Sequence, residues 1–202
     1  MANKTSICKQ ALGKLGANTI IDATQMTTEA QLCEEYYQDI LEDILEEHPW
    51  TFAIKRYELP KSAESPPKPF AAKFLVPPDV LRVLDASSNP DFTEMNPTDW
   101  QLEGRYIIAN AGIMYARAVS KQTDPGEFSA KFTRVLVTRL AAEMALAITQ
   151  SRELHKQLMD EFAILLDYAV SADGQQGRSR KYRSDQLILV RTSGTSFAGP
   201  FV

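Results

Sequence analysis

The chain has 202 residues, of which 44% are hydrophobic and 24% charged, and its formal net charge is −4 at pH 7. A chain of this length buries roughly 70% of its unfolded surface on folding, so its core requires neither a disulfide nor a metal ion. The acidic balance excludes a protein that works by coating nucleic acid with a basic surface. The sequence also has no apolar run of the ~18 residues that a membrane span needs.

Two helices are expected before Pro49. Helical spacing of apolar residues marks the first, over residues 5–15. The second begins at Thr27 or Thr28, where a hydroxyl residue precedes Gln31 in the spacing of a capping box. Its apolar stripe consists of Ala30, Cys33, Tyr37, Ile40, Leu41, Ile44 and Leu45. Cys8 and Cys33 form no CxxC pair and no Cys/His cluster, so we expect reduced, packed thiols and a cytosolic origin.

The pattern changes to β structure after His48. The aromatic and β-branched run at 50–59 predicts a strand that ends at Pro60, and a proline-rich loop follows. Further strands are predicted at 70–76, 80–85 and 113–119, together with a hairpin at 100–109 that turns at Glu103-Gly104. We expect these strands to form a small insertion with one shared core.

Helix returns at Asp124-Pro125-Gly126-Glu127, which offers an N-cap aspartate and a proline at the first helical position. An apolar stripe continues to about Gln150, and a second long helix is expected from Ser151 to near Gly174. The amino terminus lacks the long apolar core of a signal peptide, so we expect neither secretion by the general route nor membrane insertion.

The fold class expected from these elements is mainly α. An antiparallel helical bundle comprises residues 1–49 and 120–173, a small β subdomain is inserted at 50–119, and an extended C-terminal arm covers 174–202. Because the apolar stripes are used within one chain, we expect a monomer in isolation.

Catalytic motifs are scarce. Gly13-Lys14-Leu15-Gly16 lacks the spacing of a phosphate-binding loop. His48 and His155 lie in no nucleophile motif and have no metal-ligand spacing, so His48 is interpreted as a complement to the negative end of a helix and His155 as a surface residue. We expect no enzyme, no cofactor and no metal site.

The second helix carries an acidic face. Between Glu29 and Glu47 the chain has eight acidic residues and no Lys or Arg. A solvated face is the ordinary interpretation, and two functional interpretations stay open: paired carboxylates of a glycosidase, or the wall of a channel that repels a polyanion. The residues turned away from the apolar stripe are Glu35, Asp39, Glu42, Asp43 and Glu46.

Several short segments occur in a distinctive order over residues 5–170. After the two-helix start, they are His48-Pro49-Trp50-Thr51-Phe52-Ala53, Val76-Pro77-Pro78-Asp79-Val80-Leu81-Arg82-Val83-Leu84, Leu102-Glu103-Gly104-Arg105-Tyr106-Ile107-Ile108, Tyr115, Phe128, Phe132 and Leu140-Ala141-Ala142-Glu143-Met144-Ala145. Their order and spacing resemble the tail tubular protein A, or tail adaptor, family of short-tailed bacteriophages. The helix, β-insertion, helix layout agrees with the fold of that family.

The resemblance implies a virion structural protein in the neck of the particle, present in the host cytoplasm during assembly. Such a head-to-tail connector binds the portal protein after DNA packaging, forms a ring of twelve copies and extends the DNA channel. It also provides the platform for a tail nozzle of the tubular protein B type, and DNA passes without sequence-specific binding. No membrane partner is implied.

The C-terminal arm supplies the candidates for contact with the portal or a neighbouring subunit, because it combines basic residues with a strand-like apolar run. Two other classes stay open: a carboxylate-dependent cell-wall hydrolase of the tail, and a protein-binding module of a host cell. The arm candidates are Arg178, Arg180, Lys181, Tyr182, Arg183, Leu187, Ile188, Leu189, Val190 and Arg191.

Overall fold

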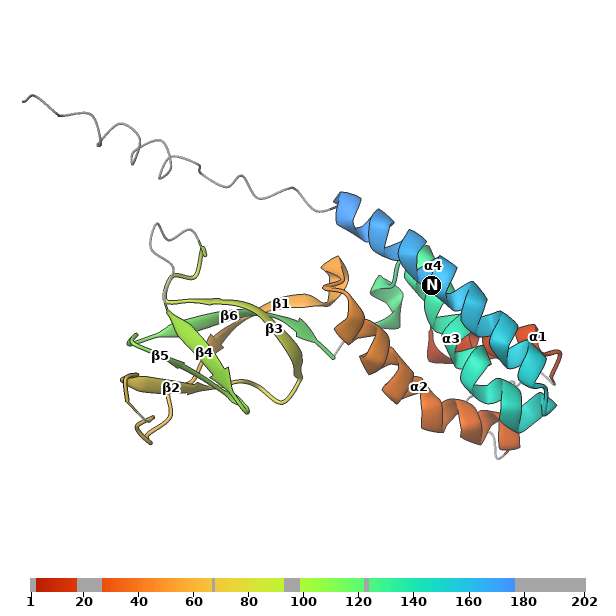
Figure 1. Cartoon of the computed structure of the whole chain (residues 1–202), viewed down its shortest axis with the longest axis horizontal. Coiled ribbons are helices and arrows are strands. Elements are labelled where there is room, and N and C mark those ends of the chain that lie inside the picture. The colour runs from red at the N-terminus through yellow and green to blue at the C-terminus, as the bar shows by residue number, and fades with distance from the viewer. Residues whose placement is uncertain (1–2, 18–26, 67, 93–98, 122–123, 177–202) are drawn as a thin grey trace, which may run out of the picture.

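The computed structural model describes residues 3–17, 27–66, 68–92, 99–121 and 124–176, and helices and sheets occupy separate ends of it (Figure 1). The helices are α1 (Lys4–Leu15), α2 (Thr28–Glu47), α3 (Ala130–Thr149) and α4 (Arg152–Gln176), with 3-10 helices η1 (Thr51–Ala53) and η2 (Pro125–Glu127). The strands are β1 (Ile54–Leu59), β2 (Ala72–Leu75), β3 (Val80–Ser87), β4 (Trp100–Glu103), β5 (Tyr106–Ala109) and β6 (Met114–Ser120). Of the helices described, none is long and apolar enough to cross a membrane.

Side-chain caps mark where α1, α2 and α3 begin. Asn3 caps α1, and its Oδ1 accepts a hydrogen bond from the Ser6 amide at 2.7 Å. Thr27 rather than Thr28 caps α2. The helix predicted from Asp124 is only the single turn η2, because Phe128 is extended and Ser129 caps α3 one turn later. Asp124 therefore starts a helical turn, as its sequence signal predicts, but not the long helix.

The strands form two antiparallel three-stranded sheets. The first has the order β1-β6-β3 and the second β2-β5-β4. The predicted hairpin is confirmed: β4 and β5 pair with Glu103 opposite Tyr106, and Gly104 has a φ of 58° that favours glycine. The strand predicted from Trp50 starts only at Ile54, because residues 51–53 form η1.

The two sheets are joined along one edge. Beyond β1 the chain runs beside β2, where the Leu75 amide donates to the Pro60 carbonyl at 3.0 Å and the Ser62 amide to the Lys73 carbonyl at 2.8 Å. These bonds cover the outer edge of β2. A second hydrophobic core lies between the sheets and includes Leu59, Phe74, Ile107 and Met114.

The mainly α class expected from the sequence is wrong. Of the described residues, 53% are helical and 22% lie in strands, so the protein combines α and β structure rather than forming a mainly α bundle. The physical reason lies in the larger of the two hydrophobic cores, which is built mainly from the four α-helices but which these helices do not close by themselves. Val119 of β6 is buried in it, and Leu81 and Leu84 of β3 pack against its edge.

Helix α3 is the centre of the helical layer. It packs against α1, α2 and α4, and ten of its side chains are buried, including Thr138. The stripe predicted for α2 is confirmed, since all seven of its residues are buried.

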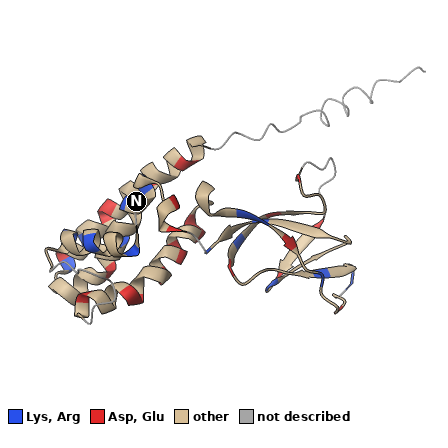
Figure 2. Ribbon diagram, turned by 180° about the vertical axis from the view of Figure 1, so that it is seen from behind, with Lys and Arg blue, Asp and Glu red and all other residues tan. Residues whose placement is uncertain are grey.

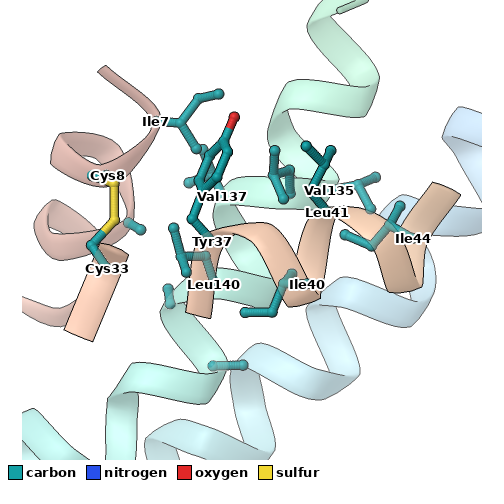
Figure 3. Packing of buried hydrophobic residues seen from close by; sticks show 14 of the residues in the cluster. Ile7, Cys8, Cys33, Tyr37, Ile40, Leu41, Ile44, Val135, Val137 and Leu140 are labelled. Atoms are coloured by element: carbon teal, nitrogen blue, oxygen red, sulfur yellow. A yellow bond between two sulfur atoms is a disulfide. The ribbon is translucent and has the colours of Figure 1, made fainter. Parts of the chain in front are cut away.

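Cys8 and Cys33 form a disulfide that links α1 to α2, with their Cα atoms 6.1 Å apart (Figure 3). The expectation of reduced thiols is therefore wrong. Neither residue shows a motif in the sequence, and only the packing of the two helices against α3 brings them together. The disulfide also removes the premise from which a cytosolic origin was expected.

Removing this disulfide should lower the free energy of unfolding. The bond closes a loop between residues 25 positions apart, and the entropy lost by the unfolded chain predicts a change of about 2–4 kcal/mol for Cys8→Ala/Cys33→Ala. Urea denaturation of the variant and of the oxidised and reduced wild type measures this change. Thiol titration in denaturant should find no free thiol before reduction, and two free thiols at that stage would show that the bond is absent.

Tyr37 predicts a loss of stability at alkaline pH. Its ring is buried in the larger core, the described residues offer its hydroxyl no hydrogen-bond partner, and burial raises its pKa to about 12 (Figure 3). Between pH 10 and 12 the unfolded chain loses a proton that the folded chain retains, so stability falls as pH rises. Tyr37→Phe should remove about 1–3 kcal/mol of this fall while leaving stability at pH 7 within about 0.5 kcal/mol. Urea denaturation of both proteins at pH 7, 10 and about 11.5 gives the free energy of unfolding at each pH. An equal fall in the two proteins between pH 10 and 11.5 would contradict the raised pKa of Tyr37.

Candidate interaction surfaces

Each histidine has one polar partner among the described residues. His48 follows α2, and its Nε2 is 3.2 Å from Oδ2 of Asp173 in α4. The Nδ1 of His155 is 2.9 Å from the carbonyl oxygen of Ala142, so His155 is half-buried against α3 rather than at the surface as predicted. The described residues contain no group of three or more His, Cys, Asp or Glu side chains that could hold a metal ion.

Asp173 ties the end of α4 to the segment that leads into β1. It is 7% exposed and accepts hydrogen bonds from the Thr51 amide at 3.1 Å and from the Thr51 hydroxyl at 2.8 Å. The carboxylate lies between the histidine and the hydroxyl, whereas in a catalytic triad the imidazole lies between the carboxylate and the nucleophile. This arrangement caps η1 and holds the junction; it does not activate Thr51.

Replacing Asp173 should therefore destabilise the fold. Asp173→Ala removes the acceptor of the Thr51 amide and hydroxyl and the partner of the half-buried His48 ring; because Thr51 is exposed and water can replace part of these bonds, we expect a cost of about 1–2 kcal/mol. Asp173→Asn keeps the shape and one acceptor oxygen and should cost less than half as much. Urea denaturation of both variants measures the difference. An unchanged midpoint for Asp173→Ala would contradict a structural role for the carboxylate.

Five acidic residues of α2 share one face, which we call the acidic face, and all but the half-buried Glu42 are exposed: Glu35, Asp39, Glu42, Asp43 and Glu46 (Figure 2). Glu42 accepts a hydrogen bond from Gln38 at 2.7 Å, and Asp43 lies 3.9 Å from the guanidinium of Arg139. Glu35, Asp39 and Glu46 have no ion pair with any described residue. The sequence placed these five side chains on one face, and the structure brings them together there.

A hollow that sequence reasoning missed opens between α1 and α4 over the first half of α3. It has a volume of about 520 Å³ and is lined by Lys14, Arg134, Val137, Glu161 and Leu165 among others. A smaller hollow of about 210 Å³ shares Arg134 and Leu165 with it and adds Lys131 and Tyr168. We call the two together the α1/α4 groove.

The α1/α4 groove combines unpaired positive charge with exposed apolar surface. Lys14 pairs with Glu161 at 2.5 Å, but Lys131 and Arg134 are exposed and form no ion pair with the described part of the chain. On the α4 side Tyr168 is 66% exposed and the neighbouring Ile164 is 58% exposed. Both lie outside the apolar stripe of α4, and bulky apolar residues off the stripe are the signal that could have identified this surface.

The arm candidates lie outside the described residues. They are Arg178, Arg180, Lys181, Tyr182, Arg183, Leu187, Ile188, Leu189, Val190 and Arg191.

Comparison with known proteins assigns no relative, because no family model and no curated protein matches this chain.

Proposed function

We propose that this protein is the head-to-tail adaptor of a tailed bacteriophage, a virion structural protein rather than an enzyme. In this proposal copies of the chain form a ring under the portal protein, extend the DNA channel and carry the tail nozzle. The observation that carries the proposal is the order of segments resembling the tail adaptor family. In support of it, those segments are the ones on which this fold depends.

The segment from His48 to Ala53 forms the junction between helices and sheets. Trp50 is 1% exposed, its indole Nε1 donates to the Ile44 carbonyl at 2.8 Å, and its ring meets that of Phe132 edge-on at 4.8 Å. Phe128, a further residue of the resemblance, packs against Phe52 and Phe132 at centroid distances of 5.3 and 4.8 Å. Aromatic contacts of this kind stabilise a core beyond the area they bury.

The remaining segments hold the sheets and α3. In the second segment, Asp79 lies in the turn before β3, where its carboxylate accepts a hydrogen bond from the Tyr57 hydroxyl at 2.7 Å. Gly104 turns the β4–β5 hairpin. Leu140, Ala141, Ala142, Met144 and Ala145 are all buried in α3. A resemblance carried by fold-determining residues supports a shared architecture, and the adaptor role follows from that resemblance alone.

Two parts of the chain would meet partners in such an assembly. We assign the portal contact to residues 178–202, whose five basic residues and apolar run suit acidic groups and a sheet edge. In a ring, the acidic face could occupy one of two locations. It either lines the channel, where like charge keeps DNA from adhering, or contacts a neighbouring copy.

Deleting residues 178–202 should abolish attachment to the portal with little effect on thermal stability. The two buried cores are built from residues up to Ala169, so the deletion removes none of their described contacts. Pull-down of the purified full-length chain and of the shortened chain with the portal protein of the same particle measures attachment. Differential scanning calorimetry measures the melting transition, which we expect to shift by less than about 2 °C.

A second pair of variants makes this test specific for charge. Arg178→Glu/Arg180→Glu should weaken attachment, whereas Arg152→Glu/Lys156→Glu, with the same change in net charge on exposed positions of α4, should leave it intact. A full-length chain that fails to attach to the portal would overturn the proposed adaptor function. Hydrolysis of cell-wall polymer that is lost in Glu42→Gln would favour the enzyme instead.

A further inference from the structure

The basic residues of the α1/α4 groove form a short row on α3, which we call the basic lane. Lys131 and Arg134 are three residues apart on α3, which places them on adjoining positions of one helix face. Tyr168 lines the groove and Ile164, four residues before it on α4, is exposed beside it, so the two form a second, apolar lane along the groove. The groove therefore presents a basic lane and an apolar lane, both open to solvent and both made by helices that the core holds rigidly.

The chain itself carries a surface with the complementary charge. Glu35, Asp39 and Glu46 follow one another at helical spacing along α2 and form no ion pair with the residues that the structure describes. Partly exposed Leu32 and Tyr36 border this face and offer it an apolar flank.

The two surfaces are on different sides of the molecule. The groove is lined by α1, α3 and α4, whereas α2 packs on another side of α3 with its acidic face turned outward (Figures 1 and 2). They cannot meet within one chain. A contact between unlike surfaces on two copies is heterologous, and repetition of such a contact produces a ring when the rotation closes.

We propose that the α1/α4 groove of one copy binds the acidic face of α2 of the next copy, with Lys131 and Arg134 facing Glu35 and Asp39 and with Tyr168 and Ile164 against the apolar flank. The inference rests on the proposed function only for closure into a ring. It assigns the acidic face to a neighbouring copy rather than to the channel.

Other occupants fit the groove less well. A nucleic acid backbone would supply phosphates for Lys131 and Arg134 but no apolar surface to cover the exposed Ile164 and Tyr168. The C-terminal arm carries Arg178, Arg180, Lys181 and Arg183, which Lys131 and Arg134 would repel. An acidic helix with an apolar flank satisfies both lanes, and α2 is such a helix.

The contact is expected to be weak for an isolated chain. Its ion pairs are exposed, so salt screens them strongly, and the chain should remain monomeric at physiological ionic strength. Attachment to the portal would raise the local concentration of copies and make the same contact effective. Self-association at low ionic strength is therefore the property that reveals it.

Sedimentation equilibrium of the full-length chain tests the inference at about 0.02 M and about 0.5 M salt, where the screening lengths differ severalfold. The wild type should self-associate at low salt and be monomeric at high salt. Lys131→Glu/Arg134→Glu and, separately, Glu35→Lys/Asp39→Lys should each lower the association constant at least about tenfold. Mixing the two variants should restore association. The groove variant still has the wild-type acidic face and the α2 variant still has the wild-type groove, so these two surfaces can bind each other.

Two controls separate the contact from general charge effects. Arg152→Glu/Lys156→Glu carries the same charge change as the groove variant but lies outside the groove, and it should associate like the wild type at equal pH. Tyr168→Ala/Ile164→Ala should weaken association without any change in charge, and circular dichroism confirms that every variant is folded.

A wild type that is monomeric at low salt, or variants that fail to restore association when mixed, would overturn the inference. So would binding of a labelled DNA duplex that depends on Lys131 and Arg134 in a chain that does not self-associate. The proposed function is judged separately by portal attachment. Attachment without low-salt association removes this inference alone, whereas low-salt association without attachment removes the adaptor function alone.

Discussion

The buried carboxylate of Asp173 is the contact that fixes how the helical part of the protein meets the β region. It joins α4 to Thr51, 122 positions earlier in the chain, and thereby connects the end of the last helix to the start of the β region. Trp50 and Phe132 meet immediately beside this junction and close the larger core. Because the carboxylate accepts hydrogen bonds from the backbone and the hydroxyl of the same residue, it restricts the direction in which the chain enters β1 as well as its position.

Beside this junction, the helical layer has a packed interior around α3 and charged surfaces on its outside. Helix α3 packs against the three other helices and buries ten of its side chains, and the charged surfaces lie on the outer faces of α2 and α4 and at the exposed start of α3, where Lys131 and Arg134 lie. Acidic residues gather on α2, and basic and apolar residues gather beside α4. A chain with a modest net charge of −4 thus presents two local fields of opposite sign, which net charge alone does not indicate.

Local patterns predicted the elements well where the deciding interaction is local. The stripe of α2 depends on helical periodicity alone, and all seven residues are buried as predicted. The turn at Gly104 depends on one residue that tolerates positive φ. The predictions failed where a distant partner decides. Asp124 offers a good cap, but Ser129 supplies the cap that α3 uses, and η1 replaces the start of a strand because Asp173 holds Thr51.

The candidate surfaces divide in the same way. The sequence by itself determined that Glu35, Asp39, Glu42, Asp43 and Glu46 share one face, because residues three and four apart on a helix point the same way. Only the tertiary structure decided that the α1/α4 groove exists, since Lys131, Arg134, Leu165 and Tyr168 line it from two helices whose packing no periodicity specifies. The pairing of Cys8 with Cys33 and the mixed α and β class were decided there too. Each depends on which faces meet across the core, and that is a property of the whole chain rather than of any segment.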